Sequence, residues 1–240
     1  GIYTVSESAT PFGYILSQPF DVNIDTDGET QSFDIENKAI RSNITIIKND
    51  IDTGLPVLIA GTEFKIMDSD GIYIIQNGID TFTTDDVGSV TLDLPLYLGQ
   101  YTLHEISSPY GYYIDETPIP FSVDESSTSE IILEHSNEKI LKQIRVTKSD
   151  TRDSGRKLEG TVFDIIDSYE TVVETITTNS NGEALSSLLP YGAYTVKEKT
   201  PPVGFTISNE AHSVFIGDEK NEVYDVFTQN EPTEITIFKK

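Results

Sequence analysis

The chain has 240 residues, with 40 Asp plus Glu against 16 Lys plus Arg, so its formal net charge at pH 7 is −24. So acidic a surface repels nucleic acids and anionic lipids, and we expect neither a nucleic-acid nor a membrane partner. The absence of cysteine excludes disulfides and thiolate metal sites. No apolar run approaches the roughly 18 residues of a membrane-spanning helix.

The first forty residues contain two predicted strands that end in a polar residue. The segment Tyr3–Glu7 ends in glutamate and is followed by a Pro-x-Gly-aromatic turn at Pro11–Tyr14, whereas Phe33–Asn37 ends in asparagine. Both patterns occur again later in the chain, where a third kind of strand, ending in lysine, precedes them. We therefore interpret residues 1–40 as the C-terminal half of a repeated unit.

Residues 41–140 contain all three patterns. They are Ile44–Lys48, Tyr101–Glu105 and Ile131–Asn137, and turn signals such as Asn77-Gly78 separate the strands between them. Apolar and polar residues alternate, and no window has a helical period. This segment is predicted to be one complete all-β unit, large enough to bury its own core.

Residues 141–232 repeat the same order. Their strands are Ile144–Lys148, Tyr194–Glu198 and Tyr224–Asn230, and a further lysine strand, Ile235–Lys239, begins another unit at 233–240. The chain is therefore expected to be a fragment of a longer tandem array, with neighbouring domains of that array as its partners. The short spacing of the turns favours a β-sandwich in each unit.

Polar residues occupy positions on the mostly apolar face of these strands. Residues two apart share one face of a strand, so Lys48, Glu105 and Asn137 each extend a mostly apolar row, as do their counterparts Lys148, Glu198 and Asn230. Burying a charge without a partner costs several kcal/mol, which implies that the three residues meet. They either form a buried salt bridge with an asparagine partner, reach water at the rim of the sheet, or carry chemistry.

The chemical interpretation uses the same burial. Desolvation lowers the pKa of a lysine and raises that of a glutamic acid, so both groups become neutral. A neutral amine is a nucleophile that can attack the asparagine amide, while the glutamic acid moves the proton and ammonia leaves. The product is a Lys–Asn isopeptide bond, formed once per unit without an external enzyme, cofactor or metal, so the chain is not expected to be an enzyme with turnover.

The motifs in this order resemble the Cna-B-type (SpaA-like) domains of Gram-positive surface adhesins and pilins. The resemblance rests on the Lys-x-Asp strand ends, the Tyr-x-Leu/Val-x-Glu-x-x-x-Pro-x-Gly-Tyr/Phe segments and the closing asparagine strands. It implies a transthyretin- or immunoglobulin-like β-sandwich with bonds Lys48–Asn137 and Lys148–Asn230, promoted by Glu105 and Glu198. No bond is expected at the unpaired equivalents Glu7 and Asn37 unless another chain or further residues supply the amine, and Lys239 would serve a following unit.

The resemblance also implies a function. It indicates a structural stalk or pilus backbone that is extracellular and attached to the cell wall. The main alternative is a ligand-binding adhesin module that recognises a host protein or glycan, for which the long segment Gly71–Val90 is the candidate region. A third alternative is an accessory module of a secreted polysaccharide-active enzyme. The three histidines lack the spacing of metal ligands, so no metal site is expected.

Overall fold

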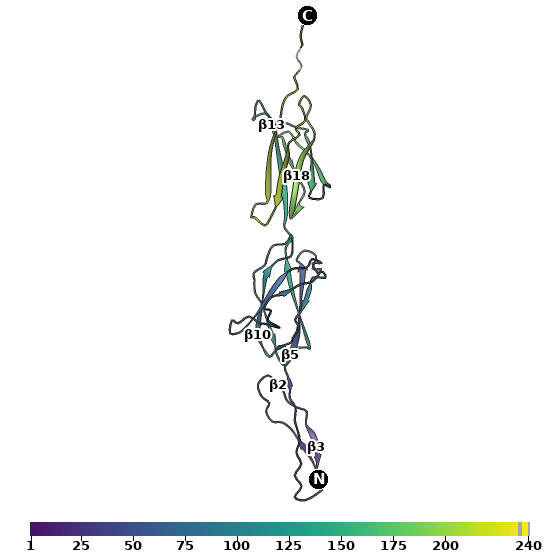
Figure 1. The fold of residues 1–240 in the computed structure, drawn as a ribbon, viewed down its shortest axis with the longest axis vertical. Coiled ribbons are helices and arrows are strands. Elements are labelled where there is room, and N and C mark those ends of the chain that lie inside the picture. Colours follow the sequence, from purple (N-terminus) through teal and green to yellow (C-terminus); the bar gives the residue numbers. More distant parts are fainter. Residues whose placement is uncertain (235–236, 240) are drawn as a thin grey trace. The chain divides into compact units, whose positions relative to one another are not determined.

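The computed structural model describes residues 1–234 and 237–239. It contains two compact units, the first made of residues 1–110 and 114–137, and the second of residues 111–113 together with the chain from Glu138 onward. Across the described residues every regular element is a β-strand, so none of them forms a helix that could cross a membrane. Figure 1 shows these strands along the chain.

The N-terminal segment, residues 1–40, forms two small antiparallel sheets. Strand β1 pairs with β3, and β2 with β4; their bounds are Ile2–Val5, Tyr14–Ile15, Phe20–Asn23 and Lys38–Ala39 for β1 to β4. Two predictions are wrong here, because the first strand stops before Glu7 and Phe33–Asn37 is not a strand. Two-stranded sheets bury little surface, and Phe12 remains 89% exposed.

The middle domain is a sandwich of two sheets. One has the strand order β11-β10-β6-β7, and the other has β12-β5-β8 with β9 also paired to β5. The strands β5 to β12 are Arg41–Asp50, Glu63–Asp68, Phe82–Thr83, Ser89–Thr91, Leu96–Tyr97, Gly99–Ser107, Ile119–Val123 and Glu130–Asn137. Apolar residues from both sheets, such as Ile46, Phe64 and Leu103, form one buried core.

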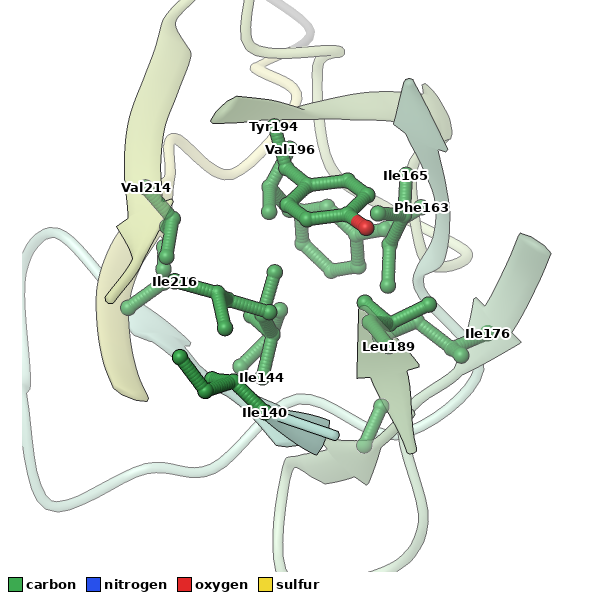
Figure 2. Close-up of a cluster of buried hydrophobic side chains, with 13 residues drawn as sticks. Ile140, Ile144, Phe163, Ile165, Ile176, Leu189, Tyr194, Val196, Val214 and Ile216 are labelled. Atoms are coloured by element: carbon green, nitrogen blue, oxygen red, sulfur yellow. The ribbon is translucent and has the colours of Figure 1, made fainter. Parts of the chain in front are cut away.

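The last domain repeats this arrangement. Its sheets have the orders β15-β14-β18-β19 and β16-β13-β17, with β20 also paired to β13. The strands β13 to β20 are Leu141–Asp150, Val162–Asp167, Val172–Thr177, Glu183–Leu185, Leu189–Pro190, Gly192–Thr200, Ala211–Ile216 and Val223–Asn230. Figure 2 shows its core, where Phe163 and Val196 from one sheet face Ile144 from the other. The predicted all-β sandwich is confirmed.

The first and last strands of each domain are neighbours and run parallel. In the middle domain β5 pairs with β12, which places His135 opposite Lys48 and Asn137 opposite Asp50. In the last domain β13 pairs with β20 in the same register, so Thr228 lies opposite Lys148. Parallel neighbours need a long connection, and here nearly the whole domain is that connection.

In each domain a glycine carbonyl accepts a hydrogen bond from the backbone N–H of the buried lysine. Gly182 has φ +69°, its carbonyl accepts a 2.7 Å hydrogen bond from the Lys148 N–H, and a Cβ added to it would lie 2.5 Å from the Lys148 carbonyl oxygen. Gly88 has φ +76°, its carbonyl accepts a 2.8 Å hydrogen bond from the Lys48 N–H, and a Cβ added to it would lie 2.3 Å from the Val57 carbonyl oxygen. Only glycine fits such a turn.

The predicted strand at 233–240 falls partly on residues 235, 236 and 240, which lie outside the described residues. The described part, residues 237–239, has no strand, and Lys239 is exposed. The domain boundaries 41–140 and 141–232 stay predictions.

Candidate functional site

Three strands of the last domain bring a lysine, a glutamate and an asparagine together in the core. Lys148 lies on β13, Glu198 on β18 and Asn230 on β20, and none is more than 4% exposed. The Lys148 ammonium donates to Glu198 Oε2 at 2.8 Å, and Asn230 Nδ2 donates to Glu198 Oε1 at 2.7 Å. One carboxylate therefore contacts both the amine and the amide.

The surrounding groups complete this site. Lys148 Nζ also donates to Thr228 Oγ1 at 3.1 Å and lies 5.6 Å from the centre of the Phe163 ring. Asn230 Nδ2 also donates to the Thr206 carbonyl at 2.8 Å, while its buried Oδ1 accepts no hydrogen bond from the described residues. Burial lowers the pKa of Lys148, although the hydrogen bond to Glu198 opposes the shift.

The equivalent residues of the middle domain are equally buried but differently connected. Asn137 Nδ2 donates to both carboxylate oxygens of Glu105 at 2.9 Å, so the contact between acid and amide is present. Lys48 Nζ instead donates to two backbone carbonyls, those of His135 at 3.0 Å and Asn49 at 3.3 Å. Within the described part of the chain, no hydrogen bond joins Lys48 to Glu105.

Burial shifts both titratable groups of this site toward neutrality. It lowers the pKa of Lys48 to about 8, although the negative charge of Glu105 acts in the opposite direction. It also raises the pKa of Glu105, despite hydrogen bonds from the Asp115 N–H and the Asn137 amide that favour the carboxylate. Burial in the core thus favours the neutral form of both the amine and the acid.

The N-terminal segment contains the same acid–amide contact without burial. Asn37 Nδ2 donates to the two Glu7 oxygens at 3.0 and 2.7 Å, and the Ser17 N–H donates to Glu7 at 2.9 Å. These bonds lower the pKa of Glu7, with Ser17 the larger cause. Equivalent bonds surround Glu105, whose pKa is raised, so burial decides the direction of the shift.

Sequence reasoning missed the backbone donor that orients two of the three glutamates, Glu7 and Glu105. The Asp115 N–H donates to Glu105 at 2.8 Å, as the Ser17 N–H does to Glu7. Both donors follow their glutamate by ten residues, a spacing visible in the sequence. The sequence also placed His135 and Thr228 in the buried rows without assigning them a contact with the lysines.

Among residues 1–234 and 237–239, no group of three or more His, Cys, Asp or Glu side chains could hold a metal ion.

The fold and the buried triads define a class of β-sandwich domain, and comparison with known proteins gives the family. The model of the SpaA prealbumin-like fold domain matches residues 42–139 and 142–232, which is more than half of the chain. The chain therefore belongs to the SpaA prealbumin-like domain family.

Individual relatives agree with this assignment. The trypsin-resistant surface T6 protein of Streptococcus pyogenes is 32% identical over 57 residues, which are 24% of this chain and 11% of that protein. The Bacillus anthracis TIE protein is 29% identical, with a TM-score of 0.79 over 96% of this chain and 42% of that one. The C-terminal fragment of the pilus adhesin SpaC from Lactobacillus rhamnosus GG shares the fold, with 16% identity and a TM-score of 0.55 over 82% of this chain and all of that fragment. The chain spans less than half the length of the first two relatives.

Proposed function

We propose that this chain is part of the stalk of a Gram-positive surface adhesin or pilin, extracellular and attached to the cell wall. Residues 41–140 and 141–232 are its complete domains, 1–40 belong to the C-terminal half of another domain, and 233–240 to the start of a following one. The family and the similarity to a streptococcal surface protein support this. The observation that carries the proposal is the buried contact of Glu198 with both Lys148 and Asn230.

In the last domain these contacts support an isopeptide bond that the domain forms by itself. The neutral Lys148 Nζ attacks Asn230 Cγ, the Nζ–Cγ bond forms and the Cγ–Nδ2 bond breaks. Glu198 takes the proton from Nζ and passes one to Nδ2, which leaves as ammonia. The fold supplies the proximity, which replaces an external catalyst.

The middle domain forms the same product from Lys48 and Asn137. Glu105 already holds the Asn137 amide through two hydrogen bonds. The raised pKa of Glu105 and the lowered pKa of Lys48 both favour the neutral pair that the reaction needs. Each site reacts once, so the chain has no turnover as an enzyme.

A bond at these positions changes how each domain carries force. It ties the first strand to the last, and these strands are parallel neighbours. In a tandem array a pulling force enters through the first strand and leaves through the last. The bond transmits that force directly, so the strands between them stay folded under load.

Single-molecule pulling of the full chain tests the stalk. With both bonds present, neither domain releases its chain, so the pulling trace has no unfolding step. The variant K148M/E198Q lacks the bond of the last domain and gains one step of about 280 Å, because about 82 residues extend by about 3.4 Å each. The exposed lysine variant K199M is the matched control and has no step. A wild-type step of that length contradicts the proposal.

A ligand-binding role is the second candidate, and one observation favours it. Ile72, Ile75 and Ile79 in the long segment of the middle domain are exposed, Ile75 by 66%. A glycan array and a panel of immobilised host matrix proteins test this role. A binding module loses its signal in the triple variant I72S/I75S/I79S, whereas a pure stalk gives no signal in either form.

A further inference from the structure

His135 occupies a position that the two domains fill differently. It lies on β12 directly opposite Lys48 and two residues before Asn137, so the side chains of all three share one face of the parallel pair. The corresponding residue of the last domain is Thr228, whose hydroxyl accepts a hydrogen bond from Lys148. His135 is 1% exposed and therefore belongs to the dry interior around the triad.

The imidazole of His135 has unused hydrogen-bonding capacity. Neither ring nitrogen makes a hydrogen bond of good geometry to the described residues, although the Asn137 side chain and the Asp115 backbone lie close enough to act on the pKa of the ring. The ring packs edge-on against Phe64 with centroids 5.5 Å apart. Leaving a buried polar atom unpaired costs about 1–3 kcal/mol. An apolar residue would fill this space without that cost, so the imidazole calls for a chemical explanation.

In the described part of the middle domain the amine also makes no direct hydrogen bond with the glutamate that would accept its proton. In the last domain Glu198 accepts directly from Lys148, but Lys48 makes no such contact with Glu105 in the described structure. Lys48 Nζ instead lies 3.0 Å from the carbonyl oxygen of His135 itself. Because His135 also lies opposite Lys48 in the parallel pair, its imidazole is the basic side chain of the neighbouring strand on the same face as the amine.

We propose that His135 is the proton acceptor for Lys48 when the middle domain forms its cross-link. As the Lys48 Nζ–Asn137 Cγ bond forms, an imidazole nitrogen takes the proton from Nζ. The Cγ–Nδ2 bond then breaks, a proton from the imidazolium reaches Nδ2 either directly or through Glu105, and ammonia leaves. His135 ends neutral, so atoms and charges balance. This role rests on the proposed cross-link and adds a residue to it.

The charges around His135 suit an acceptor. Burial lowers its pKa, and the positive charge of Lys48 lowers it further, whereas the negative charge of Asp115 and polar contacts with the Asn137 side chain and the Asp115 backbone oppose the shift. Glu105 accepts a hydrogen bond from the Asn137 amide, and Phe64, which packs against His135, contributes no charge. The imidazole is therefore neutral at pH 7 and becomes a base once the amine begins to lose its proton.

The test follows ammonia loss from freshly translated full-length chain. Intact mass gives the rate, and peptide mapping assigns each loss to a domain. H135Q keeps the size and polarity of the side chain but cannot take a proton, so we expect the middle bond to form about 100-fold more slowly. The last domain is the internal clock, and H104Q, which changes a histidine of the middle domain outside the site, is the matched control.

H135A separates chemistry from folding, because it leaves a space that imidazole can enter. Added imidazole restores the rate in H135A if His135 moves the proton; a purely structural role gives no rescue. A wild-type rate in H135Q, or an H135A variant that imidazole does not rescue, overturns the role of His135 alone. A wild-type middle domain that loses no ammonia instead overturns the proposed cross-link of that domain.

Discussion

The effect of the double variant K148M/E198Q on the free energy of unfolding has opposite signs for an isopeptide bond and for a buried ion pair, so it distinguishes the two. Methionine replaces the buried amine with an apolar chain of similar length, and glutamine retains a hydrogen-bond acceptor for Asn230. Removing both charges avoids leaving either one alone in the core. If the wild-type domain contains only an ion pair, this exchange is neutral or stabilises the fold by about 1–4 kcal/mol.

A cross-link reverses that expectation. Lys148 and Asn230 are 82 residues apart, and the chain-entropy relation for a loop of this size gives about 4–5 kcal/mol of stabilisation. Losing it lowers the melting temperature of a domain of this size by roughly 20–35 °C. The effect is therefore large and opposite in sign to that of an ion-pair replacement.

Differential scanning calorimetry of the full chain measures this directly. The middle domain serves as the internal reference, and K199M, which removes a half-exposed lysine paired to Asp164, controls for loss of charge. We expect the transition of the last domain to fall in K148M/E198Q and to stay in place in K199M. A double variant that melts at or above the wild-type temperature would refute the reasoning.

Three further outcomes follow from the geometry. N137A cannot cross-link, and urea titrations of this variant should show the free energy of unfolding of the middle domain rising between pH 8 and 10.5. In that range the unfolded chain still binds the Lys48 proton, whereas in the folded domain Lys48, with a pKa of about 8, has lost it. A flat or falling profile contradicts this. G182A should destabilise the last domain by about 1–3 kcal/mol more than G204A, since both glycines have positive φ but only Gly182 meets a backbone oxygen; equal losses in chemical denaturation would remove the steric argument. E7A should leave the intact-mass deficit unchanged, because Glu7 is only half-buried and its lowered pKa favours the carboxylate, and a reduced deficit would show a bond we do not expect.

The sequence predicted the fold well where strand alternation decided burial. Counting by twos from Lys48 and Glu105 identified the rows that the sandwich buries, because a strand turns alternate side chains to one face. The same reasoning failed at Phe33–Asn37, which is not a strand. The apolar row that the alternation assigned to a core, Phe33 and Ile35, is exposed, because the two-stranded sheets of the N-terminal segment bury little surface.

The site was less predictable than the fold. Repetition of the motif implied that each lysine meets its glutamate, yet Lys148 contacts Glu198 while Lys48 turns to backbone carbonyls. Alternation of apolar and polar residues predicts which face of the strand a side chain lies on. It does not predict which atoms the end of a long side chain contacts, because those contacts depend on the neighbouring residue. Here that neighbour is a histidine in one domain and a threonine in the other.

Intact-mass measurement of the purified chain, followed by peptide mapping, tests the cross-links most directly. The account predicts a mass lower than that of the sequence by two molecules of ammonia, with branched peptides joining Lys48 to Asn137 and Lys148 to Asn230. E105A should restore one ammonia and E198A the other. A wild-type mass equal to that of the sequence would contradict both bonds and leave two ordinary β-sandwiches with buried polar triads.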